Sequence, residues 1–220
     1  MKTVQTSAAK PSRPRRPPAF VLMPALRLVR RDDGPALLRF IQALSSETRR
    51  QRFHVLLSGC GPAMLAILAG ADGRRHVAYV ATLPADDGEC IVAEARYVVA
   101  SDGESAEFAL VVAEDWQGSG LADRLMDALI AQARASGLQR LFGAVRAGNI
   151  RMLRFTSRRG FIVSDNELDG ADREAGSVRV ELQIEAAPVA LASPRWPLVA
   201  SALRRWLQQH FIFPVGRLRT

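Results

Sequence analysis

Apolar and polar residues alternate over ALRLVR, residues 25–30, where the regular patterning of the chain begins. This period of two predicts a strand with one buried face. A helical period follows: Asp32 or Asp33 offers an N-cap and Pro35 stands in the first turn. The apolar stripe of this first helix consists of Leu37, Leu38, Ile41 and Leu44.

A second helix is expected through ETRRQRF (47–53), because Ser45 or Ser46 can cap it. A third, short apolar helix is expected over residues 61–70. Three strand-like runs come next, at 76–83, 89–100 and 105–112, and ADDG and SDGE turn signals separate them.

From Val112 onward the pattern changes to strand, glycine turn, helix, strand, helix, strand. The first of these helices starts at Leu121 and carries one apolar face, with Gly137 in place for a C-terminal cap. Asn149 can serve as the N-cap of the second helix, and Gly160 can end that helix. Residues 141–145, 161–163 and 178–184 are the remaining strands. The elements predict an α/β (α+β) fold with a mixed, mostly antiparallel sheet flanked by helices.

Charge divides the chain into three parts, although the formal net charge of the whole is +8. Residues 1–20 and residues 186–220 each contain five basic residues and no acidic one, so the body between them is slightly acidic. We therefore expect a disordered basic Pro/Arg-rich tail at 1–22, a folded domain at 23–186, and a basic extension at 187–220 with an amphipathic helix. The tails are either solvated or in contact with an anionic surface, and the extension packs on the domain, on a second copy in a homodimer, or on a membrane surface.

Several function classes are disfavoured by the composition. No apolar run approaches the ~20 residues of a membrane span, and no aromatic-basic interleaving indicates a specific nucleic-acid partner. Cys60 and Cys90 form no C-x-x-C pair and have no metal-ligand spacing with the histidines, so no metal is expected. The start has no signal-peptide pattern, which predicts reduced thiols and a cytoplasmic protein.

The segment VAEDWQGSGLADRL (112–125) carries the most chemical information, because a strand ends at Val112 and Gln117-Gly118-Ser119-Gly120-Leu121-Ala122 turns directly into a helix. Main-chain N–H groups then converge at a positive helix end, where a pyrophosphate can bind. A Walker motif is excluded because no Gly-Lys-Ser/Thr follows, and a dinucleotide G-x-G-x-x-G fails at Asp123.

Val112, Gln117, Gly120 and Ala122 resemble the V-x(4)-Q/R-x-x-G-x-G/A signature of GNAT acetyltransferases, and NIRMLRF (149–155) with Gly160-Phe161 resembles a second family segment. Residues 43–53 and 95–121 are similar to the GNAT module of bacterial protein-lysine acetyltransferases. The resemblance spans roughly residues 25–185 and implies a GNAT fold with six or seven strands.

The resemblance also implies a site for acetyl-CoA as cosubstrate. The strand before the turn would lend main-chain groups to the pantetheine arm, and Asn149 either binds the cofactor or only caps its helix. By position the cofactor residues are Leu110, Val111, Val112, Gln117, Gly118, Ser119, Gly120, Leu121, Ala122 and Asn149. Arg124 could reach a phosphate or be a surface charge.

Glu107 is the candidate general base, since it is a carboxylate within the otherwise apolar strand AEFALVV. A lysine amine is about 3.4 pKa units from its neutral form at pH 7, a cost of roughly 4.6 kcal/mol, and a carboxylate can take that proton. The alternative is a salt bridge between Glu107 and an arginine. Weaker candidates are Glu94, expected on an exposed strand face, and Asp115, expected at a loop surface. Thr156 occupies the position where many GNAT enzymes have a tyrosine that protonates the leaving thiolate, so the resemblance implies no such general acid here.

The sequence thus predicts an acetyl-CoA-dependent N-acetyltransferase whose acceptor is a primary amine, with protein lysine favoured. Two alternatives are an acetyltransferase for small amines or amino acids, and a non-catalytic acyl-CoA sensor that communicates through its tails.

Overall fold

A computed structural model of the chain describes residues 23–53, 68–86, 88–164 and 176–185. The strands are β1 (Ala25–Leu28), β2 (His76–Ala85), β3 (Gly88–Val99), β4 (Ser105–Val112), β5 (Arg140–Arg146), β6 (Ile162–Ser164) and β7 (Ser177–Gln183). The α-helices are α1 (Gly34–Ala43), α2 (Ser46–Phe53), α4 (Leu121–Ala135) and α5 (Ile150–Arg158), and two 3₁₀ turns are η1 (Arg31–Asp33) and η2 (Glu114–Trp116).

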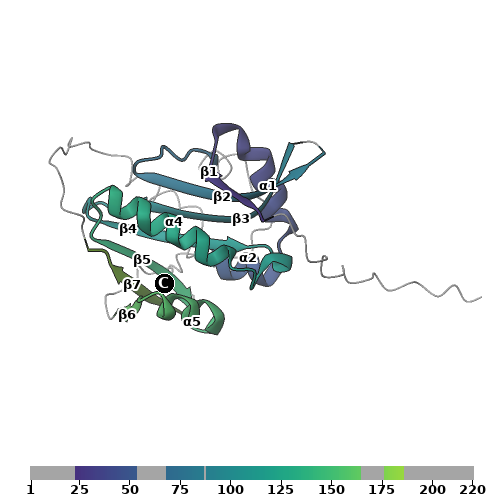
Figure 1. Cartoon of the computed structure of the whole chain (residues 1–220). Coiled ribbons are helices and arrows are strands. Elements are labelled where there is room, and N and C mark those ends of the chain that lie inside the picture. Colours follow the sequence, from purple (N-terminus) through teal and green to yellow (C-terminus); the bar gives the residue numbers. More distant parts are fainter. Residues whose placement is uncertain (1–22, 54–67, 87, 165–175, 186–220) are drawn as a thin grey trace, which may run out of the picture.

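All seven strands form one sheet in the order β1-β2-β3-β4-β5-β7-β6, from the top to the bottom of Figure 1. Neighbouring strands are antiparallel except β4 and β5, which run parallel because α4 connects them as a crossover. The predicted mixed, mostly antiparallel sheet is confirmed, and so are the strand positions, to within a few residues at each end.

Each face of the sheet buries its own core, because successive strand residues point to opposite faces. On one face α4 and α5 pack on the central strands, and α4 crosses in front of the sheet in Figure 1. On the other face α1 packs on β2 and β3. Strand β4 contributes to both cores, with Phe108 and Val112 facing α4 and Val111 facing α1.

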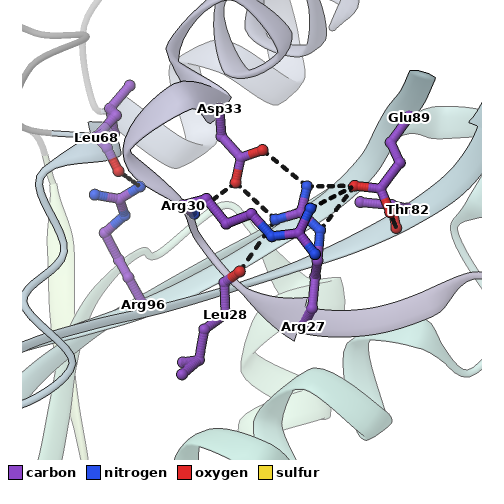
Figure 2. A network of polar contacts seen from close by, with 8 residues as sticks. All are labelled: Arg27, Leu28, Arg30, Asp33, Leu68, Thr82, Glu89 and Arg96. Atoms are coloured by element: carbon purple, nitrogen blue, oxygen red, sulfur yellow. Dashed lines mark hydrogen bonds and ion pairs between the residues drawn. The ribbon is translucent and has the colours of Figure 1, made fainter.

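The first strand is fastened by an ion-pair network around Arg27 (Figure 2). The Arg27 guanidinium donates to both carboxylate oxygens of Asp33, at 2.7 and 2.8 Å, and also to Glu89 at 2.6 Å. Asp33 precedes α1 and Glu89 belongs to β3, so this arginine ties β1, the start of α1 and β3 together.

Asp33 precedes α1 as predicted, but its carboxylate makes no capping hydrogen bond to that helix because it accepts from Arg27 and from the Arg30 N–H. The predicted signals at other helix ends are confirmed. The Oγ of Ser45 accepts a hydrogen bond from the Thr48 main-chain N–H ahead of α2, and Gly137 has a positive φ of 74° just after α4. The expected helix at 61–70 and both tails lie wholly or mostly outside the described residues, and the three domain boundaries stay predictions. None of the helices in the described ranges is long and apolar enough to span a membrane.

Candidate active site

The two parallel strands separate partway along their length. Pairing between β4 and β5 covers only three positions and ends at Glu107 opposite Phe142, although β4 continues to Val112 and β5 to Arg146. The Phe108 ring lies against the β5 backbone, since a Cβ on Gly143 would stand 2.8 Å from its Cε1 atom. A glycine at 143 therefore lets the aromatic ring fit where the strands part.

The alternation of hydrogen bonds decides which main-chain groups of β4 face this separation. The Ala113 N–H donates to the Val92 carbonyl of β3, and the Ala100 N–H donates to the Ser105 carbonyl. In an antiparallel ladder every second residue bonds to the same neighbour, so Val111 directs its main chain toward β3. Leu110 and Val112 direct theirs to the side where β5 has moved away. Of the three strand residues predicted for the pantetheine arm, these two lie at the opening.

The turn after β4 has the backbone that its glycines allow. Gly118 and Gly120 have φ values of 85° and 87°, in the left-handed region that L side chains rarely adopt. A Cβ on Gly120 would meet nothing within 4 Å, so the space beside its Cα atom is open. Gly120 stands directly before α4, and no described side chain caps that helix N-terminus. The first N–H groups of α4 thus remain available to an anion.

Gln117 connects the end of β4 with α5. Its Nε2 donates to the Val112 carbonyl at 3.1 Å, and its Oε1 accepts from Nη1 of Arg151 at 2.6 Å. The predicted turn residue Gln117 therefore links the last carbonyl of β4 to the first turn of α5, the helix that follows β5. Arg151 was missed by the sequence reasoning, although an arginine in the first turn of a helix is a visible anomaly.

Asn149 and Thr156 serve the structure of α5. The Asn149 side-chain oxygen accepts from the Met152 N–H at 3.0 Å, an N-cap. Thr156 is 1% exposed and donates to the Met152 and Leu153 carbonyls of its own helix. Tyr97 is no substitute for the absent tyrosine, because its hydroxyl contacts Ser136 at the far end of α4, about 22 Å from the turn.

Glu107 is an exposed residue of β4 and the last one to pair with β5. Its side chain lies on the face of the sheet that α1 and α2 cover, since the neighbouring residues Ala106 and Phe108 point into the α4 core. Burial lowers the pKa of Arg52 on α2, and the carboxylates of Glu94 and Glu107 oppose that shift. The structure therefore places Glu107 beside α2 at the mouth of the strand separation.

Glu94 was expected on an exposed strand face, and this expectation is wrong. Glu94 is only 3% exposed and pairs with Arg96 on its own strand and, at 3.5 Å, with Arg52. Arg96 continues the network to Nε2 of His76 at 2.9 Å and to the Leu68 carbonyl at 3.2 Å (Figure 2 shows the latter contact). Glu94 is a buried structural carboxylate that fastens α2 to the sheet.

Electrostatics within this network fix its protonation. Burial favours the neutral acid, yet the Arg96 and Arg52 guanidinium groups hold the pKa of Glu94 below its usual value. Burial and the neighbouring Arg96 lower the pKa of His76 to about 4. Since arginine offers only donors, Nε2 of His76 accepts and the ring stays neutral near pH 7.

The remaining candidates are accounted for without a ligand. Asp115 is exposed in η2, as expected. Arg124 donates to the Pro24 carbonyl at 3.0 Å and so supports the start of β1. No group of three metal-binding side chains occurs in the part of the chain that the structure describes.

The sheet opens between its two parallel strands, and a glycine turn and an uncapped helix N-terminus at the opening leave main-chain donors where a phosphate can bind. The chain belongs to the acetyltransferase (GNAT) family, which its residues 41–161 match.

Two curated relatives support this assignment. Acetyltransferase PA5475 of Pseudomonas aeruginosa is 33% identical over 138 residues, which cover 62% of this chain and 74% of the relative. Acetyltransferase Pat of Mycolicibacterium smegmatis is 34% identical over 119 residues, 54% of this chain and only 35% of that longer protein.

Solved structures agree with the fold. The GNAT domain of S. lividans PAT superposes with a TM-score of 0.64 at 24% identity, covering 72% of this chain and 89% of that domain. The structure of yncA from Salmonella typhimurium with acetyl-CoA gives a TM-score of 0.53 at 18% identity, covering 78% and 100%.

Proposed function

We propose that this acetyltransferase moves the acetyl group of acetyl-CoA onto a primary amine, the side chain of a protein lysine, with Glu107 as the general base. One observation carries the proposal: Glu107 is an exposed carboxylate at the residue where β4 and β5 stop pairing. A base at this position lies on the same strand as Leu110 and Val112, the residues that would hold the pantetheine arm next to the thioester.

The residues present fit acetyl-CoA. Gly120 leaves open space where a Cβ would stand, and the N-terminus of α4 offers main-chain donors to a pyrophosphate. Leu110 and Val112 would bind the pantetheine arm through main-chain groups that β5 no longer uses. The bound cosubstrate supplies an activated acetyl carbon, and an N–H of β4 would stabilise charge on its carbonyl oxygen.

The chemistry is a direct transfer. The neutral amine nitrogen attacks the acetyl carbon, the C–N bond forms, and the C–S bond breaks. The proton leaves the nitrogen for Glu107, and the thiolate takes a proton from water. The Cα atoms of Glu107 and Leu110 are about 10 Å apart along the strand, so one bridging water between the amine and the carboxylate suits this spacing.

No acid from the protein is assigned to the departing thiolate. Among the described residues, Thr156 is committed to its own helix and Tyr97 points to the other end of α4. A CoA thiol with a pKa of about 8.5, by analogy with cysteine, leaves readily without such help.

Protein lysine is favoured as acceptor because residues 43–53 and 95–121 resemble the corresponding module of bacterial protein-lysine acetyltransferases.

The test is acetyl-CoA turnover against cellular protein extract and, in parallel, a panel of small amines and amino acids, with product masses recorded. An increase of one acetyl mass on protein lysines supports the proposal. Turnover confined to free amines or amino acids would contradict protein lysine as the acceptor. CoA binding without turnover on any amine would favour the sensor alternative.

A further inference from the structure

Arg151 stands in an electrostatically unfavourable place. It is the second residue of α5, whose first turn contains no acidic residue. A cation at a helix N-terminus opposes the helix dipole. The N-terminus of α4 lies close by, since Gln117, which leads into that helix, accepts a hydrogen bond from Arg151, and the guanidinium lies beside Gly118. No carboxylate pairs with this exposed arginine within the described ranges of the chain.

The guanidinium nevertheless has a defined position. Nη1 donates to Oε1 of Gln117 at 2.6 Å, and Nη2 lies 3.7 Å from the point where a Cβ on Gly118 would be. Gln117 is itself held by the Val112 carbonyl at 3.1 Å. The arginine thus comes from α5, on the β5 side of the strand separation, and rests on the glycine turn that follows β4.

We propose that Arg151 is a phosphate-binding residue of this acetyltransferase that grips the pyrophosphate of CoA over the glycine turn; the inference rests on the cofactor site proposed above. The pyrophosphate dianion of CoA, placed between the turn and α5, offsets the repulsion between the arginine and the two helix ends. It also accepts two parallel N–H bonds from one guanidinium, a geometry that lysine cannot supply. Gln117 holds the guanidinium in place through Nη1, so the parallel Nε–H and Nη2–H donors along its other edge remain for the ligand.

The experiment compares Arg151→Met with Arg154→Met, a matched loss of charge three residues further along the same helix. Arg154 is exposed and makes no ion pair with the described residues. Affinities are measured by titration calorimetry, in displacement format for weak ligands, with CoA, with dephospho-CoA, which lacks the 3′-phosphate, and with pantetheine, which lacks every phosphate.

We expect Arg151→Met to weaken CoA and dephospho-CoA binding by the same factor of about 10 to 100 and to leave pantetheine binding within twofold. Arg151→Lys should fall between, and Arg154→Met should match the wild type. An equal loss for all three ligands would show that Arg151 only shapes the turn, and a loss for CoA alone would place it on the 3′-phosphate. Either result, or no loss, overturns the inference while leaving the cofactor site intact. A folded wild type that binds none of the ligands would refute the cofactor site and this inference together.

Discussion

The Glu114 carboxylate accepts a hydrogen bond from the main-chain N–H of Ser45 at 2.9 Å, across 69 positions of sequence. Glu114 begins the 3₁₀ turn η2, which leads from β4 into the glycine turn, and Ser45 begins the segment that caps α2. Burial opposes ionisation, but bonds from Thr48 and Ser45 hold the pKa of Glu114 below its usual value. The Glu114 carboxylate therefore connects the glycine turn with the helix beside Glu107.

Glu114→Ala should lower the free energy of unfolding by about 1 to 2 kcal/mol, because the Ser45 N–H loses a charged acceptor. Urea unfolding measures this loss. Asp115→Ala is the control, since its exposed carboxylate adjoins Glu114 in the same turn, and it should change stability by less than about 0.5 kcal/mol. An equal loss of unfolding free energy in the two variants would show that the hydrogen bond between Glu114 and Ser45 does not stabilise the fold.

Gly120→Glu should weaken acetyl-CoA binding at least tenfold, because it puts a side chain and a negative charge where a pyrophosphate would bind. Gly137→Glu at the opposite end of α4 is the control. Both glycines have positive φ values, 87° and 74°, and neither has an atom within 4 Å of a Cβ position, so both variants carry a similar backbone strain of about 1 to 2 kcal/mol. Calorimetry on the folded proteins should show lost affinity for Gly120→Glu alone. Unchanged affinity in that variant would exclude the turn as the phosphate site.

Glu94→Gln should destabilise the protein by about 3 kcal/mol or more, because it leaves the buried Arg52 and Arg96 guanidinium groups without their shared carboxylate. Glu47→Gln removes a partner from the exposed pair with Arg50 and should cost less than about 1 kcal/mol. Chemical denaturation compares the two. A Glu94→Gln protein as stable as the wild type would contradict the structural role assigned to this carboxylate.

Stability should fall as the solution is acidified from pH 8 to pH 5, in part through His76. Its pKa is lowered from 6.5 to about 4 by burial and by Arg96, so the unfolded state binds the proton first as the pH falls. The loss from this residue is about 2 kcal/mol at pH 5. His76→Gln keeps an acceptor for Arg96 and should reduce the pH dependence of the melting temperature. A pH dependence identical to that of the wild type would show that His76 is not buried in its neutral form.

The sheet could be predicted from the sequence because the alternation of apolar and polar residues in each strand reflects which of its residues are buried. Alternation over residues 25–30 and turn glycines between the long strands located β1 to β4. The side-chain face of a single residue is harder to predict. Glu94 has apolar neighbours on β3 and was expected to be exposed to solvent. The alternation of residues separates the two faces of a strand but does not tell which face a helix covers. The helix α2 covers the face of Glu94 and pairs Arg52 with it. Opposite charges at Glu94 and Arg96, two residues apart on one strand, were the available signal.

The glycine turn could be predicted because its chemistry is local, within residues 117–122. Arg151 could not be placed by the same reasoning, because 34 positions separate it from Gln117 and only the fold of β5 and α5 brings them together. The main-chain hydrogen bonds of Val111 point toward β3 because of the register between β3 and β4. The residue pattern of one strand does not reveal this register.

The role of Glu107 as general base is the central claim, and the turnover of Glu107→Gln tests it most directly. The variant keeps the shape of the side chain and removes the proton acceptor, so acetyl-CoA affinity should stay near wild type, while the melting temperature reports the lost attraction between Glu107 and Arg52. Glu104→Gln, an exposed carboxylate just before β4, is the matched control and should turn over normally. We predict that Glu107→Gln lowers kcat per folded molecule by about 10²- to 10⁴-fold at pH 7 and that raising the pH partly restores it, because more of the amine is then neutral. Turnover equal to that of the wild type at pH 7, with or without a lower melting temperature, would contradict the assignment of Glu107 as the base.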